Sequence, residues 1–201
     1  MTKEQILSTA FDLFSQYRIK KVSMDDIARS VSVSKRTLYD FFEDKETLLV
    51  QGMKYNANRL DEVLTELEKG SYTAVDVILL FYMEIMKRPR WYNKQYYEDL
   101  KKYPDAFNTN EELKGKFIKK CKVLFDRGAK EGVFQPEVNF EIMALLAKEQ
   151  LKMLQPSKSF CNHSNMDVYN TVLFTFLRGI CKEKGQTILE RYAVKLSFKL
   201  Q

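Results

Sequence analysis

Two adjacent cations, Lys35 and Arg36, directly follow Ser34, and their side chains could bind the phosphates and base edges of DNA. Serine commonly caps the N-terminus of a helix, so both cations are expected in a first turn, where they oppose the helix dipole. This placement costs roughly a few tenths of a kcal/mol per cation, whereas a specific base contact contributes about 1–3 kcal/mol. The pair therefore predicts an anionic ligand that offsets the cost. The alternative is a solvated pair on a surface helix.

Two short predicted helices position these cations. A hydroxyl cap at Ser23 predicts a helix over 23–30, and Ser34 predicts a second helix over 34–41, with a tight link at 30–33. This spacing is typical of a helix-turn-helix, in which the N-terminal end of the second helix enters the DNA major groove. The apolar residues expected to form the inner core are Ile27, Val31, Val33 and Leu38.

Residues 23–49 resemble the DNA-binding signature of the tetracycline-repressor (TetR) family of bacterial transcriptional regulators. Their sequence is SMDDIARSVSVSKRTLYDFFEDKETLL, and the matching features are a hydroxyl cap before DIA, then VSK, TLY, an aromatic pair, and KE before leucines. The resemblance implies an all-α fold of nine to ten helices. It implies a three-helix helix-turn-helix DNA-binding domain over 1–46 and a larger helical effector-binding and dimerisation domain over 47–201.

The resemblance also implies roles for individual residues of this signature. Ser23 would bind a phosphate, Ser34 would cap the recognition helix, and Lys45 would hold a phosphate at the start of the fourth helix. The cations after Ser34 would reach bases or backbone, with Thr37 and Tyr39 fixing the register on phosphates. Structural alternatives remain open: both serines act only as caps, and Tyr39 packs inward. The predicted DNA-binding set is Ser23, Ser34, Lys35, Arg36, Thr37, Tyr39 and Lys45.

The signature departs from the family pattern in two respects. Ser32 occupies a turn position where the family often has glycine, so a residue with a Cβ must adopt a left-handed conformation, at about 1 kcal/mol. Residues 1–50 also hold eight basic and eight acidic side chains, which leaves this domain formally neutral. Affinity must then come from placement, with the cations on one face and the acids turned away; the acids that crowd the end of the recognition segment are Asp40, Glu43, Asp44 and Glu46. The cations expected on that face are Lys20, Lys21, Lys35, Arg36 and Lys45.

Helices are expected along the whole chain, because only seven glycines and four prolines occur in 201 residues. Thr2 and Gln5 form a capping-box pattern at the start of a helix over 2–17. A Gly-rich or low-complexity segment is absent from the sequence, and no segment is a convincing strand. Further helices are expected over 44–70, 140–154, 167–181 and 186–200.

A homodimer on a palindromic operator is expected, because one helix-turn-helix buries too little surface for tight specific binding. Two helices are candidates for the dimer interface. The segment 140–154 is apolar almost all round, which predicts a buried helix, and 167–181 has a broad apolar face. The alternative is that both helices fill the core of one subunit. The predicted interface residues are Val168, Val172, Leu173, Phe176, Leu177 and Ile180.

An aromatic-rich region spans 72–131. In the TetR family the corresponding helices enclose an effector pocket, so the resemblance implies a small, largely apolar ligand whose binding releases the operator. Two alternatives stay open: these aromatic residues are plain core, and the C-terminal domain is regulated by a protein partner instead of a small molecule. The predicted ligand-binding residues are Phe81, Met86, Trp91, Tyr92, Tyr96 and Phe125.

Other classes of protein are not supported by the sequence. A single histidine, His163, with no catalytic motif predicts that the chain is not an enzyme, and no cofactor or metal site is indicated. The longest uncharged run has ten residues, so no membrane partner is expected and the predicted localisation is cytoplasmic. The net charge of +6 suits a polyanionic partner, and repression is the family's commonest mode. Cys121 and Cys161 lie near cations or the histidine, which leaves a redox sensor or an inert buried thiol as alternatives.

Overall fold

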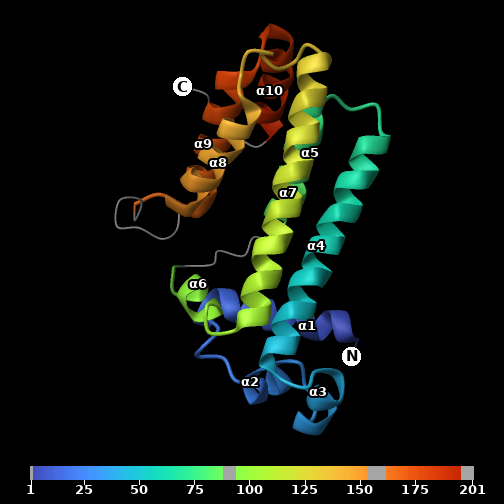
Figure 1. The fold of residues 1–201 in the computed structure, drawn as a ribbon, viewed down its shortest axis with the longest axis vertical. Helices are drawn as coiled ribbons and strands as arrows, with labels where there is room; N and C mark the ends of the chain where they lie inside the picture. Colours follow the sequence, from blue (N-terminus) through green and yellow to red (C-terminus); the bar gives the residue numbers. More distant parts are fainter. Residues whose placement is uncertain (1, 88–93, 154–161, 196–201) are drawn as a thin grey trace. The chain divides into compact units, whose positions relative to one another are not determined.

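The computed structural model describes residues 2–87, 94–153 and 162–195 and is all-α over these ranges, with ten helices (Figure 1). This confirms the predicted fold class. By packing, the chain divides into two compact units: Met1–Glu62 with Arg88–Lys116, and Val63–Lys87 with Phe117–Gln201. This division uses a different criterion from the predicted functional boundary after residue 46, which stays a prediction.

The first unit contains the helix-turn-helix. Its helices α1, α2 and α3 lie against one another in chain order (Figure 1). Two longer helices, α4 and α7, contribute residues to both units. The helices with residues in the first unit are α1 (Lys3–Tyr17), α2 (Met24–Ser30), α3 (Lys35–Phe41), α4 (Lys45–Lys69), α6 (Lys94–Leu100) and α7 (Pro104–Lys130).

Hydroxyl caps fix the helix starts in the first unit where the sequence predicts them. Thr2 and Gln5 form a reciprocal capping box at the start of α1. Ser23 forms the same kind of reciprocal capping box with Asp26 at the start of α2, and Ser34 caps α3 by accepting from the Thr37 N–H; both serines have an extended backbone conformation. Because a cap satisfies backbone N–H groups that the helix itself leaves unpaired, it defines the first residue of the helix locally.

The apolar faces of these helices form the core of the first unit. Ile27, Val31 and Leu38 are buried, as predicted, and Val33 is half-buried. Gly52 lies where α4 approaches α1 so closely that an added Cβ would be 2.1 Å from the ring of Phe11. The core therefore holds α2 and α3 together while it leaves the outer face of α3 to solvent.

The turn between α2 and α3 has the strained residue that the sequence predicts. Ser32 has φ 55°, in the left-handed region that favours glycine. The turn is closed by two backbone hydrogen bonds, from Ser32 N–H to the Arg29 carbonyl at 3.1 Å and from Val33 N–H to the Ala28 carbonyl at 3.0 Å. These bonds and the buried residues on either side hold the angle between the two helices.

The second unit packs around α10, which contacts α5 and α9, while α8 contacts α9. An isolated bridge pairs Phe134 with Cys181, so that the loop after α7 is joined to the start of α10. Within the described residues, the second unit also holds the later parts of α4 and α7. Its own helices are α5 (Ala74–Met86), α8 (Phe140–Met153), α9 (Asn165–Ile180) and α10 (Glu183–Lys195).

Helix α8 differs from the prediction of a buried helix. Ile142, Leu145 and Leu146 lie three and four residues apart, on one side of the helix, and are 54%, 50% and 49% exposed. The described residues of the second unit leave this side of α8 uncovered. Within one chain, α8 therefore has a buried apolar side and an exposed apolar side, although its sequence is apolar on most sides.

Candidate nucleic-acid interface

Helix α3 presents the predicted DNA-binding side chains on its outer face. Leu38 points into the core and is fully buried, whereas Lys35, Arg36 and Tyr39 are exposed and Thr37 is half-buried. Tyr39 is 43% exposed, so the inward-packing alternative does not describe it. The helical spacing that buries Leu38 therefore places the cations and the phenol together at the surface.

Ser23 and Ser34 are both engaged as caps. The Asp26 N–H donates to Ser23 Oγ at 3.1 Å, and the Ser23 N–H and hydroxyl donate to Asp26 Oδ2 at 2.8 and 2.6 Å. The Thr37 N–H donates to Ser34 Oγ at 3.0 Å. The hydrogen bonds from Ser23 hold the pKa of the Asp26 carboxyl below its ordinary value. Whether either serine also binds a phosphate stays a prediction.

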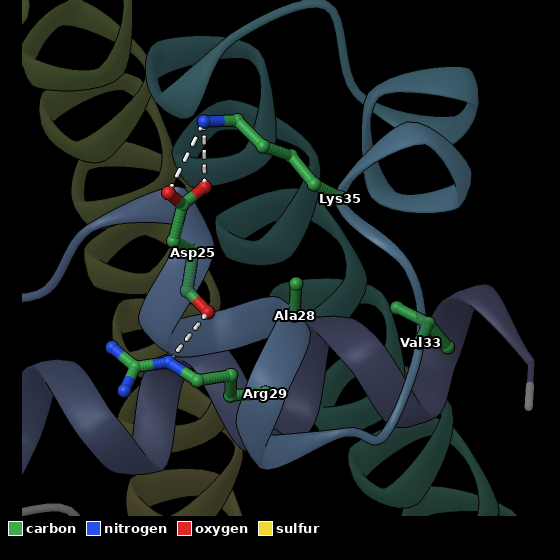
Figure 2. Close-up of a pocket in the computed structure, with 5 residues that line it drawn as sticks. All are labelled: Asp25, Ala28, Arg29, Val33 and Lys35. Atoms are coloured by element: carbon green, nitrogen blue, oxygen red, sulfur yellow. Dashed lines mark hydrogen bonds and ion pairs between the residues drawn. The ribbon is translucent and has the colours of Figure 1, made fainter.

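Lys35 is held by an acid of the preceding helix. Its Nζ lies 2.9 Å from Asp25 Oδ1 and 3.1 Å from Asp25 Oδ2, and 6.0 Å from the centre of the Tyr39 ring. Figure 2 shows the carboxylate of Asp25 aimed at the ammonium from α2. The hydrogen bond and the charge of Asp25 raise the pKa of Lys35. Asp25, which lies outside the group of acids at 40–46 that is predicted to turn away, thus faces a cation of α3.

A shallow hollow of about 320 Å³ lies beside this ion pair, between α2 and α3. The side chains of Ala28 and Val33 line it together with Asp25, Arg29 and Lys35 (Figure 2). The Arg29 Nε donates to the Asp25 carbonyl at 3.4 Å, and its guanidinium pairs with the Asp26 carboxylate. The rim of the hollow is therefore occupied by charges that the protein already pairs.

Arg36 differs from its neighbour. It is exposed, and its guanidinium makes no hydrogen bond or ion pair with any residue that the structure describes. A planar guanidinium with five donors suits bidentate contacts to guanine or phosphate. Of the two cations that the sequence singles out, only Arg36 has all of its donors available to a ligand.

Lys45 lies in a different place from the one expected of a phosphate contact. Its ammonium donates to the carbonyls of Ile19 and Val22, in the loop between α1 and α2, and lies 5.6 Å from the centre of the Phe14 ring. Burial lowers the pKa of this lysine, although the charge of Asp99 opposes the shift. The reason is geometric: the start of α4 faces the loop, and two carbonyls there need a donor. Whether Lys45 also holds a phosphate stays a prediction.

Asp99 of α6 holds the same loop between α1 and α2 in place. No pattern in the sequence predicts this structural role. Its carboxylate is 2% exposed and accepts from Arg18 Nη2 at 2.9 Å, from Arg18 Nε at 3.3 Å and from the Lys20 N–H at 3.0 Å. Burial would raise the pKa of Asp99, but the hydrogen bonds from Arg18 and Lys20 outweigh it and lower the pKa. Arg18 also has φ 75°, so the pair fixes an unusual backbone conformation. No local spacing relates residues 81 positions apart.

The predicted ligand-binding residues are not brought together in one unit. Tyr96 lies in the core of the first unit, whereas Phe81 and Phe125 are buried in the second unit, and Met86 is half-buried near the end of α5. The ring of Phe125 packs against three other phenylalanine rings, with centroid distances between 5.3 and 6.3 Å. Two further predicted residues, Trp91 and Tyr92, lie outside the described residues.

The predicted dimer residues all lie on α9 but differ in exposure. Leu177 and Ile180 are 1% exposed, so they already pack inside their own subunit. The half-buried residues, which keep surface for a partner, are Val168, Val172, Leu173 and Phe176.

Other kinds of site find little support in the structure. Burial raises the pKa of the Cys121 and Cys181 thiols to about 11, which disfavours the reactive thiolate; Cys161 lies outside the described residues. Among the residues described, no group of His, Cys, Asp or Glu could hold a metal ion. No helix in the described ranges is long and apolar enough to cross a membrane. Together, the fold and the exposed cations of α3 are those of a protein of the helix-turn-helix class.

Comparison with known proteins agrees with this class. Residues 6–51 match the family model of bacterial regulatory proteins, tetR family. The chain is 27% identical over 108 residues to IcaR of Staphylococcus aureus, the HTH-type negative transcriptional regulator of the biofilm operon icaADBC. This match covers 54% of the chain and 58% of IcaR. The chain is 33% identical over 86 residues to the HTH-type transcriptional regulator YhgD of Bacillus subtilis, covering 39% of the chain and 45% of YhgD. The matches thus span about half the length of these curated relatives.

The fold is shared with solved regulators over nearly the whole chain. A TetR-family transcriptional regulator from Marinobacter aquaeolei superposes with a TM-score of 0.72 at 17% identity, covering 98% of both chains. Residues 6–51 are thus similar to bacterial regulatory proteins of the tetR family, and the chain as a whole shares the fold of the solved regulator.

Proposed function

We propose that this chain is a tetR-family transcriptional regulator, a cytoplasmic repressor that binds a palindromic operator as a homodimer and is released by a small, largely apolar effector. The observation that carries the DNA-binding part is the guanidinium of Arg36, which lies on the exposed face of α3 and has no partner among the described residues. The similarity to IcaR, a negative regulator, supports repression. Thr37 and Tyr39 lie on the same surface and would complete the contact with the major groove, beside the Lys35 ammonium that Asp25 holds.

The arrangement of this surface supports specific over non-specific binding. Cations drive non-specific attraction to DNA through phosphate contacts, and the first fifty residues are formally neutral. Lys35 and Lys45 are also paired or buried within the protein. Affinity for an operator must then depend on a few well-placed groups, of which Arg36 is the one suited to read a guanine.

The dimer would form through α8 and α9. Ile142, Leu145 and Leu146 expose a continuous apolar stripe on α8, and the adjacent α9 carries four half-buried apolar residues. An exposed stripe of this kind is typical of an interface that a second copy buries. Sedimentation at micromolar concentration tests this: Leu145→Lys with Leu146→Lys should give a monomer, whereas Val194→Lys, at a still more exposed apolar residue of α10, should leave a dimer. A monomeric parent chain would contradict the proposal.

The effector would bind in the second unit, where Phe81 and the half-buried Met86 lie on α5. Phe125 lies in an aromatic cluster of the same unit and stays a predicted ligand-binding residue. Native mass spectrometry of freshly purified protein tests this part of the proposal. A retained small molecule would support it, and a retained protein would instead indicate regulation by a protein partner.

Selection of bound duplexes from random DNA tests the proposed function as a whole. The expected result is one enriched palindromic sequence with two half-sites, because a two-fold dimer presents two copies of α3. A chain that enriches no sequence at low ionic strength would contradict the proposal.

A further inference from the structure

The two cations in the first turn of α3 differ in their contacts with the protein. Lys35 forms an ion pair, whereas Arg36 is available to a ligand. Asp25, in the first turn of α2, contacts the Lys35 ammonium through both carboxylate oxygens. Both side chains are more than half exposed, so solvent and salt reach the pair and it can open. Arg36, the next residue, has no such partner among the residues described.

The two cations would also contribute differently to DNA binding. A lysine ammonium is a point charge that binds any phosphate, so a freed Lys35 would strengthen binding to every sequence. An arginine guanidinium makes bidentate contacts that distinguish guanine from other bases. A carboxylate beside the first of these cations therefore weakens sequence-independent binding and leaves sequence-dependent contacts in place.

We infer that Asp25 is a specificity-determining residue, which keeps the Lys35 ammonium on the protein and so leaves Arg36 as the cation of α3 that reads DNA. The inference rests on the proposed operator binding, and it adds an acid of α2 to the set of residues that control it. Figure 2 shows the geometry on which it depends: the Asp25 carboxylate lies between α2 and the Lys35 ammonium, with both of its oxygens toward the cation. Asp25 would thus raise specificity by weakening binding to duplexes that lack the operator sequence.

The test measures binding to the selected operator and to a scrambled duplex of the same length over a series of salt concentrations. Asp25→Asn should strengthen binding to the scrambled duplex and steepen its salt dependence by about 0.9 per subunit, the slope of one additional phosphate contact. Binding to the operator should change less, so the ratio of the two affinities should fall. Because Asp25 is exposed, the variant should keep the fold, which circular dichroism checks.

Asp40 provides a matched control, since it is an exposed acid on α3 that holds no cation in the described chain. Asp40→Asn adds the same net charge but frees no ammonium, so the slope should stay at the parent value. The double variant Asp25→Asn with Lys35→Ala should lose the gain of Asp25→Asn. Equal effects of Asp25→Asn and Asp40→Asn, or a gain that persists without Lys35, would overturn the inference while operator binding stands. A parent chain that binds no duplex at low salt would overturn both.

Discussion

Helices α2 and α3 have the same length and the same kind of cap but opposite charges in their first turns. Each has seven residues after a serine cap. The first turn of α2 carries Asp25 and Asp26, which favour the positive end of the helix dipole, whereas that of α3 carries Lys35 and Arg36, which do not. Helix α2 is therefore built for its own stability, and α3 accepts a local cost that a bound anion would offset.

The loops before the two helices differ in the contacts that hold them, and the loop before α2 is again the more strongly stabilised. The loop that enters α2 is fixed by two distant side chains: Lys45 donates to its carbonyls, and the buried Asp99 accepts from Lys20 N–H and the Arg18 guanidinium. Among the described residues, the turn that enters α3 is held by short-range backbone hydrogen bonds, the core and the exposed Asp25–Lys35 ion pair. Long-range side-chain contacts therefore fix the position of α2, which supports α3. The outer face of α3 stays exposed and can contact a ligand.

The largest expected loss of stability comes from removing the Lys45 ammonium, which holds the loop before α2. Lys45→Ala should lower the free energy of unfolding by about 2–3 kcal/mol, because the carbonyls of Ile19 and Val22 lose their donor and Phe14 loses a packing partner. Urea denaturation measures the loss. The salt dependence of operator binding should stay unchanged.

Lys45→Met is the matched control for this change, since it keeps the apolar stem without the ammonium. It should recover the packing part of the loss only. A drop in the salt slope of about one per subunit in either variant, with stability unaffected, would instead assign Lys45 to a phosphate.

Asp99, the second residue that holds the loop before α2, predicts that the free energy of unfolding depends on pH. The pKa of Asp99 is lowered in the folded chain, so its ionised form stabilises the fold above the unfolded pKa of about 3.9, and this contribution is lost as the pH falls below that value. Asp99→Asn should lower the free energy of unfolding by about 1–2 kcal/mol at pH 7. The difference from the parent chain, measured by urea denaturation, should shrink below about pH 4. A difference that is constant between pH 3 and pH 7 would contradict the ionised pair.

The smallest expected effects concern the two caps. Ser23→Ala and Ser34→Ala should each lower the free energy of unfolding by about 1 kcal/mol, with the larger loss at Ser23, whose capping box is reciprocal. Thermal unfolding measures both. Operator affinity, determined well below the unfolding temperature, separates the two roles of each serine. A serine that only caps leaves the affinity unchanged, and a lower affinity would add a phosphate contact at that residue.

The sequence predicts those features that short-range chemistry decides. Helix starts at Thr2, Ser23 and Ser34 follow from caps that act within one turn, and the left-handed Ser32 follows from the tight link between two helices. The burial of Ile27 and Leu38 follows from their helical spacing. The exposure of the cations on α3 follows from the same spacing, read from the opposite side of the helix.

Features that depend on contacts between distant residues were not predictable in this way. The pairs Lys35–Asp25 and Arg18–Asp99 join different helices, so no spacing within one helix indicates them. Lys45 matches a family motif, yet its direction depends on a loop more than twenty residues earlier. The exposed side of α8 depends on which neighbours cover it, which an apolar composition does not specify.

The most direct test of the account compares Arg36→Ala with Arg29→Ala on the selected operator. Arg29 is an exposed arginine of α2 that already pairs with Asp26, so it matches Arg36 in charge and exposure but not in availability. Arg36→Ala should lose about 1–3 kcal/mol of binding free energy per subunit and relax the preference at one base pair in each half-site. Arg29→Ala should change both far less. Unchanged affinity and unchanged sequence preference in Arg36→Ala would contradict the claim that α3 reads DNA through this residue.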